Sequence, residues 1–108
     1  MPSSIGPETG TAGSIGAQPT NTLVTATSTH STLNNETTLC TSGTFTDTLP
    51  TPVVNGFCRV LNSGVGVVTV ATPSGTLYSL SAATGNQTLA TGISATYQSD
   101  GTNWYRVV

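Results

Sequence analysis

The chain has 108 residues, enough for one domain, and only 6% of them are charged, with a formal net charge of −2. Its only cations are Arg59 and Arg106, too few to replace the counterions along a phosphate backbone, so we expect no nucleic-acid partner. We also expect no membrane partner, because an acidic membrane surface attracts basic residues and no apolar run approaches the ~20 residues that span a bilayer.

The first segment, residues 1–31, consists mainly of Gly, Ser, Thr, Pro and Ala, with few hydrophobic residues. It has no helical periodicity and no sustained strand alternation before Leu23, so it cannot bury enough apolar surface to offset the entropy of ordering. We predict an extended N-terminal arm that lies on a partner protein, with a tail that has no partner as the alternative. The hydrophobic residues that would contact the partner are Ile5, Ile15, Leu23 and Val24.

From residue 32 onward, short β-rich runs alternate with turn residues, which predicts a β-domain over residues 32–108. Residues 44–49 alternate with period two and stop at Pro50, which cannot donate to a β-ladder. The runs at 57–61 and 65–71 flank an Asn-Ser-Gly sequence, which is a hairpin signal. Its register stays open, because loops of two and of four residues both fit.

The last two runs, 91–99 and 102–108, flank an Asp-Gly pair, the strongest turn signal in the chain. A two-residue loop would place Tyr97 directly opposite Trp104, a cross-strand aromatic pair worth ~0.5–1 kcal/mol beyond burial. Together the runs predict an all-β fold, a compact antiparallel β-sandwich or barrel of about six to eight short strands that follows the extended arm. Because a folded part of about 75 residues buries only ~60% of its unfolded surface, we also expect a homo-oligomer.

The residue types of a catalytic, metal or cofactor site do not cluster in the sequence, so we expect no enzymatic activity and no cofactor. His30 has no neighbouring metal ligand, and no nucleophile motif supports a Ser–His–Asp arrangement around it. We therefore predict that His30 is a solvated loop residue. The acidic residues are too scattered to indicate a glycosidase pair: Glu8, Glu36, Asp47 and Asp100.

Asp47 is the only carboxylate within a predicted strand, where the alternation places it on the same face as Phe45 and Leu49. A carboxylate on an apolar face requires a partner, so we predict a buried ion pair with Arg59 or Arg106, within the chain or across subunits.

Cys40 and Cys58 leave two alternatives open, a disulfide and two buried thiols. A disulfide would add ~3 kcal/mol by the chain-entropy model. Thiols are the usual state in a reducing cytosol, and the sequence does not reveal whether the geometry permits a bond.

Three elements of the chain resemble a small β-domain that recurs in tailed-phage virion proteins, including head fibres, decoration proteins and tail-fibre segments. The elements are GTFTDTLP at 43–50, LNSGVGVVTV at 61–70 and SDGTNWY at 99–105, and the resemblance covers residues 38–108 but not the arm. Two features depart from the family pattern: Asp47 stands where an apolar residue is usual, and the Cys pair has no counterpart.

The resemblance implies a trimeric, surface-displayed virion module without a catalytic role. We expect a capsid decoration (cement) protein, made in the cytoplasm of the bacterial host, whose arm binds the major capsid protein at the virion surface and whose β-domain trimerises. The alternatives are a tail-fibre or baseplate attachment protein and a host glycan-binding module. In the glycan-binding alternative, aromatic rings stack on the sugar, and the candidates are Tyr78, Tyr97, Trp104 and Tyr105.

Overall fold

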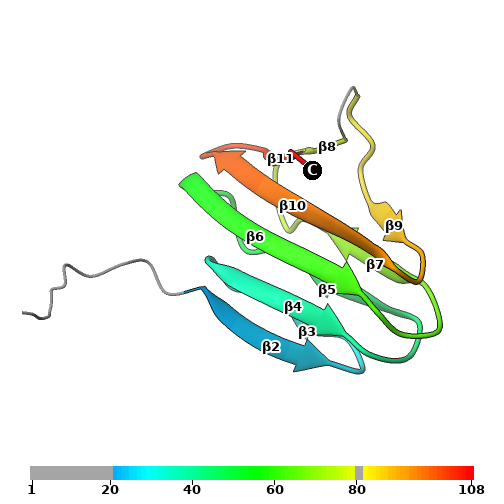
Figure 1. The fold of residues 1–108 in the computed structure, drawn as a ribbon. Helices are drawn as coiled ribbons and strands as arrows, with labels where there is room; N and C mark the ends of the chain where they lie inside the picture. The colour runs from blue at the N-terminus through cyan, green and yellow to red at the C-terminus, as the bar shows by residue number, and fades with distance from the viewer. Residues whose placement is uncertain (1–20, 80–81) are drawn as a thin grey trace, which may run out of the picture.

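The computed structural model describes residues 21–79 and 82–108, which form ten strands in two facing sheets (Figure 1). The larger sheet has the order β2 (Thr22–Ala26), β4 (Glu36–Cys40), β6 (Val54–Asn62), β10 (Ile93–Asp100), β11 (Trp104–Arg106) and β8 (Leu77–Tyr78). The smaller sheet has the order β3 (His30–Ser31), β5 (Phe45–Thr48), β7 (Val68–Ala71) and β9 (Gln87–Leu89). This described part contains no helix, and so none long and apolar enough to cross a membrane.

The chain from β2 to β7 winds as a parallel roll, alternating between the two sheets. In the larger sheet β4 pairs in parallel with β2 and β6, and in the smaller sheet β5 pairs in parallel with β3 and β7. Each turn of the roll therefore adds one strand to each sheet, as in a short solenoid. The later strands close the fold: β10 is antiparallel to β6 and β11, β9 is antiparallel to β7, and β8 is parallel to β11.

The predicted all-β class is confirmed, but the sheets are mixed and not antiparallel throughout, and the described residues form ten strands where six to eight were predicted. The hairpin predicted around Asn62 is also wrong, because β6 and β7 lie in different sheets and residues 63–67 form an arch between them. An Asn-Ser-Gly sequence favours a chain reversal. That local preference does not decide whether the next strand pairs beside the first or crosses to the facing sheet.

The arch between β6 and β7 is held by the side chain of Asn62, which is buried. Its Nδ2 donates to the carbonyls of Gly66 (3.0 Å) and Leu89 (2.8 Å), and its Oδ1 accepts from the Gly64 amide (3.2 Å). The arch lies against the preceding one, since the Gly43 amide donates to the Val65 carbonyl at 3.1 Å. Stacked arches thus form one end of the roll.

The hairpin between β10 and β11 has a wider loop than predicted. Ser99 lies opposite Trp104 and Tyr97 lies opposite Arg106, so the predicted direct pairing of Tyr97 with Trp104 is wrong. The carboxylate of Asp100 widens the loop, because its Oδ1 accepts from the amides of residues 102 and 103, both at 2.9 Å. The register moves by two residues, which preserves the facing, and both aromatic rings remain in the core.

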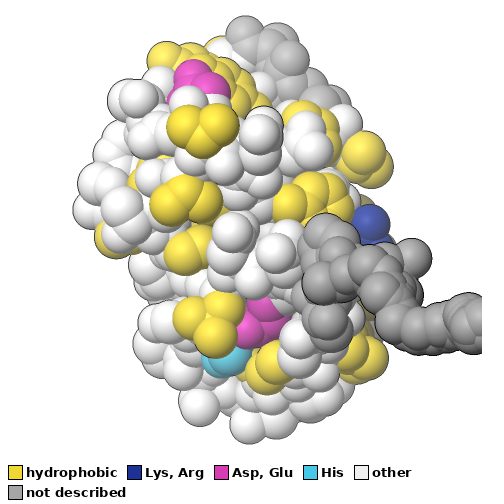
Figure 2. Space-filling model, turned by 90° about the vertical axis from the view of Figure 1, so that its left-hand side faces the viewer, with side chains coloured by type: hydrophobic (Ala, Val, Ile, Leu, Met, Phe, Trp, Pro, Cys, Tyr) yellow, Lys and Arg dark blue, Asp and Glu magenta, His cyan; other side chains and the backbone are white. Residues whose placement is uncertain are grey.

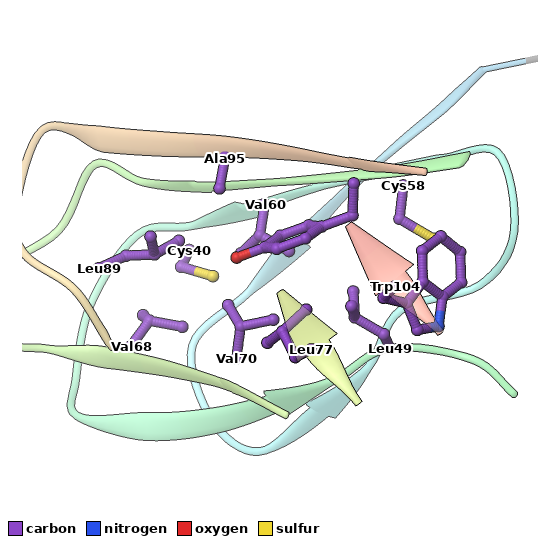
Figure 3. Packing of buried hydrophobic residues seen from close by; sticks show 11 residues of the cluster. Cys40, Leu49, Cys58, Val60, Val68, Val70, Leu77, Leu89, Ala95 and Trp104 are labelled. Atoms are coloured by element: carbon purple, nitrogen blue, oxygen red, sulfur yellow. The ribbon is translucent and has the colours of Figure 1, made fainter. Parts of the chain in front are cut away.

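Buried hydrophobic side chains fill the space between the sheets (Figure 3). Trp104 is fully buried and its Nε1 donates to the Pro50 carbonyl at 2.8 Å, while the Tyr97 hydroxyl donates to Gln87 Oε1 at 3.0 Å. Each polar group carried into the core by an aromatic ring therefore has a partner. The cluster consists of Cys40, Leu49, Cys58, Val60, Val68, Val70, Leu77, Leu89, Ala95, Tyr97 and Trp104.

The β-domain begins earlier than predicted. Residues 22–31, which we assigned to the arm from their composition, contain β2 and β3, so the predicted boundary at residue 31 is wrong for this stretch. Leu23, 65% exposed, and Val24, half-buried, are residues of a strand at the edge of the larger sheet. The other two arm candidates, Ile5 and Ile15, lie outside the described residues.

Candidate functional site

A group of polar side chains inside the first two turns of the roll is the most unusual feature of the interior. Strand alternation turns Glu36 and Thr38 of β4 inward, and the parallel register of β3 and β5 places His30 beside Asp47. Thr32, just after β3, is buried between them. We call these five residues the buried polar chain.

The buried polar chain is continuous from one carboxyl group to the other. Thr32 Oγ1 lies 2.6 Å from Asp47 Oδ2 and 2.8 Å from Thr38 Oγ1. Thr38 Oγ1 donates to Glu36 Oε2 at 2.8 Å, and His30 Nε2 lies 2.6 Å from the same oxygen. Figure 2 shows the histidine side chain beside an acidic side chain, at the point where the buried polar chain reaches the surface.

The two carboxyl groups differ in their surroundings. Burial raises the pKa of Asp47 to about 6, against the opposing effect of its hydrogen bond with Thr32, and its Oδ1 has no hydrogen-bond partner. Burial acts in the same direction on Glu36, but hydrogen bonds from His30, Thr38 and the Leu33 amide outweigh it together. They hold the pKa of Glu36 below its usual value. The buried polar chain thus joins a carboxyl group that binds its proton tightly to one that loses it readily.

The location of these groups restricts their chemistry. Asp47 is fully buried and Glu36 is 3% exposed, so neither oxygen pair can contact a molecule in solvent in this conformation. Residues 21–79 and 82–108 contain no surface pocket and no group of three or more His, Cys, Asp or Glu side chains that could hold a metal ion. What the arrangement can do is hold and transfer protons along its hydroxyl groups.

Several predicted site residues have different partners from those expected. The predicted ion pair of Asp47 with an arginine is wrong, because Asp47 contacts Thr32, whereas Arg59 is exposed and its Nε donates to Thr96 Oγ1 at 3.3 Å. The side chain of Arg106 donates to backbone carbonyls. The inward facing of Asp47, inferred from alternation, is confirmed.

His30 is not the solvated loop residue that we predicted. It lies in β3, and its Nε2 lies 2.6 Å from Glu36 Oε2, the one close contact between a basic and an acidic side chain found among the described residues. No local pattern in the sequence could indicate this contact, since it depends on a turn of the roll bringing β3 close to β4.

The two cysteines are free and buried. The parallel register places Cys40 beside Asn62, four residues along β6 from Cys58, so the two are separated by about 13 Å along the strands, which is too far for a disulfide. Figure 3 shows them at opposite ends of the core, with Cys58 beside Trp104. Of the two alternatives left open by the sequence, the structure has the buried thiols.

We expect both thiols to be unreactive in the native protein, because burial raises the pKa of Cys40 to about 11 and that of Cys58 to about 12. Titration with Ellman's reagent without reductant should detect no thiol in the folded protein and two per chain in denaturant. Failure to detect thiols in denaturant would contradict the structure and support a disulfide.

The four candidate aromatic residues for glycan stacking fall into two groups. Trp104 and Tyr97 are fully buried and belong to the core. Tyr78 and Tyr105 are neighbours on β8 and β11 with stacked rings, 5.0 Å between centroids and 12° between planes. Because each of these rings covers one face of the other, they do not form the coplanar pair that would favour glycan binding.

Comparison of the chain with protein-family models, curated proteins and solved structures finds no match.

Proposed function

We propose that this chain is a non-enzymatic structural protein of a tailed-phage particle, a capsid decoration protein displayed at the virion surface. In this proposal the β-domain trimerises and the N-terminal arm binds the major capsid protein. The observation that carries it is that the three sequence elements resembling phage virion β-domains contact one another in the folded chain.

The contacts between the three elements are direct. The first and second meet where the Gly43 amide donates to the Val65 carbonyl at 3.1 Å and where β5 and β7 pair in parallel. The third reaches the first through the bond from Trp104 Nε1 to the Pro50 carbonyl at 2.8 Å. The resemblance therefore concerns residues that depend on one another for a single framework, which supports a shared module over three unrelated turns.

Exposed hydrophobic side chains at the arch end of the roll also support a role in protein contacts. Val65 is 85% exposed on the arch between β6 and β7, and Val67 and Ile93 nearby are also exposed. The turn before β10 is fixed beside this arch, since Thr91 Oγ1 donates to the Gly64 carbonyl at 2.6 Å. Apolar side chains held on a rigid framework are typical of surfaces that bind another protein.

The experiment that tests the proposal is the copy number of the chain in purified source particles, measured by quantitative mass spectrometry against the major shell protein. A copy number comparable with that of the shell protein would support decoration. A few copies per particle would move the chain to the tail and favour attachment to the host, and absence from the particles would overturn both.

Deleting residues 1–20 should abolish attachment to the shell and leave the β-domain folded, because the cut falls before β2 begins at Thr22. In a trimer the loss of shell binding is large, since the three arms attached to one trimer of β-domains bind through a high effective concentration. The measurement is co-sedimentation with undecorated shells, together with circular dichroism and light scattering for fold and trimer. A chain with residues 1–20 replaced by a Gly/Ser segment of equal length is the matched control, and binding by either variant would exclude the arm as the anchor.

A further inference from the structure

We propose that the two carboxyl groups of the buried polar chain share one proton, that Asp47 carries it, and that the β-domain therefore takes up a proton when it folds. This property does not depend on the proposed function. It would make the fold most stable in mildly acidic solution and less stable at neutral pH.

The first argument is a count of protons along the buried polar chain. Three contacts of 2.6–2.8 Å join four oxygen atoms in a row, from Asp47 Oδ2 through Thr32 and Thr38 to Glu36 Oε2. Each contact requires one proton, and each threonine hydroxyl supplies only one. With both carboxyl groups ionised, only two protons would be present for three contacts. One pair of oxygens would then lie in contact with no proton between them. A third proton, on one of the carboxyl groups, completes the row.

The second argument decides which carboxyl group holds the third proton. Glu36 accepts from Thr38, from the Leu33 amide at 3.2 Å and from His30, whose Nε2–H can donate in the cation or in one neutral tautomer. Asp47 contacts one hydroxyl, and its other oxygen is buried without a partner. A negative charge is better stabilised where it has three donors, so the charge belongs to Glu36 and the proton to Asp47.

The resulting order of donors is the same at each step. In the protonated state that we propose, Asp47 donates to Thr32, Thr32 donates to Thr38, and Thr38 donates to Glu36; when Asp47 is ionised, Thr32 donates to it instead. The buried polar chain then contains one carboxylate at its surface end, facing the imidazole, and a neutral carboxyl group at its fully buried end.

The other titratable groups around Asp47 do not change charge in the acidic range. Burial raises the pKa of Cys40 on β4 to about 11 and of Cys58 on β6 to about 12, and it also raises the pKa of Tyr97 on β10. Arg106 acts on Tyr97 in the opposite direction. Within the buried polar chain, His30 on β3 and Glu36 on β4 also face Asp47: the charge of His30 acts to lower the pKa of Asp47, and that of Glu36 acts to raise it.

The sign of the pH dependence follows from linkage. The pKa of Asp47 is about 6 in the folded chain and 3.8 in the absence of structure, so the folded state binds more protons between these values. The stabilisation is complete below pH 3.8 and is lost as the pH rises through about 6. Glu36 acts oppositely: its pKa is lowered from 4.5, so its contribution is present above that value and is lost as the pH falls through its folded pKa.

The variant that tests the proposal is Asp47→Asn, because the amide Nδ2–H can donate to Thr32 in the way a protonated carboxyl group does. For the wild type, urea denaturation at a series of pH values should show the folding equilibrium constant falling as the pH rises from about 4 to about 6.5, and little further change above that. A displacement of two pKa units corresponds to roughly a hundredfold in that constant. Asp47→Asn should remove most of this dependence and exceed the wild type in stability at pH 7.5. The matched control is Asp100→Asn, the same change at an exposed carboxylate, which should keep the wild-type dependence.

A second measurement does not require a substitution in the core. The β-domain has two aspartates, Asp47 and Asp100, so a spectrum of the chain labelled with ¹³C at Asp carboxyl carbons shows two signals. We expect one to titrate with a midpoint near 6 and the other below 4, with Asp100→Asn removing the second. If both titrate below 4, or if wild type and Asp47→Asn have parallel stability profiles, the shared proton is refuted.

Discussion

Replacing Trp104 with Ala should lower the free energy of unfolding by ~3–5 kcal/mol, enough to unfold a marginal domain of this size. The indole ring is fully buried, and it lies so close to Gly56 that a Cβ at that position would be 2.9 Å from Cη2. Its removal leaves a large cavity between the sheets. It also leaves the Pro50 carbonyl without the donor that links β11 to the end of β5.

Urea denaturation followed by circular dichroism measures the effect of Trp104→Ala, with Tyr105→Ala as the matched control on the same strand. Tyr105 lies on the opposite face of β11 and is only partly buried, so its loss should cost clearly less. Trp104→Phe separates the two contributions, since it retains most of the ring and loses the bond to Pro50, at ~1–2 kcal/mol. Equal effects of Trp104→Ala and Tyr105→Ala would contradict the placement of the indole in the core.

Replacing Gly66 with Ala should destabilise the chain by ~2–4 kcal/mol, through backbone strain together with a steric clash. The φ angle of Gly66 is +116°, in a region that other residues rarely adopt. A Cβ there would lie 2.5 Å from the Gly43 carbonyl oxygen, which is backbone and cannot rotate away. The substitution therefore forces the two stacked arches apart.

The control for Gly66→Ala is Gly92→Ala, because Gly92 also has a positive φ, +83°, but no atom within 4 Å of the added Cβ. It should cost only the backbone strain, about 1 kcal/mol. The difference in urea midpoint between the two variants measures the stacking of the arches. If Gly66→Ala is no worse than Gly92→Ala, the arches are not in contact in solution.

Most of the local structure could be predicted from particular residues. The alternation at 44–49 and the proline that follows indicated a strand, and β5 occupies Phe45–Thr48. The same alternation placed Asp47 on the inward face, where it is fully buried. The Asp-Gly pair at 100–101 marked the reversal between β10 and β11, although the side chain of Asp100 widened the loop by bonding to two amides of its own turn.

The partners of the strands could not be predicted. β2 has too short an alternating pattern to be distinguished from the low-complexity segment before it, and it is a strand because β4 pairs with it along its whole length. The predicted hairpin at Asn62 is an arch for a similar reason: the residues specify a reversal, while the pairing of β6 with β10 and of β7 with β9 decides where each side of it lies.

The all-β class, the positions of several reversals and the inward facing of Asp47 could be predicted from the sequence, because alternation and turn chemistry are properties of neighbouring residues. The parallel winding of β2 to β7 depends on contacts between distant segments, and it is this winding that brings His30 and Glu36 to Asp47 and separates the two cysteines. Neighbours in a parallel roll are connected through the facing sheet, so their register depends on the lengths and stacking of the arches. The candidate site is therefore a product of the winding, and no segment of the chain specifies it alone.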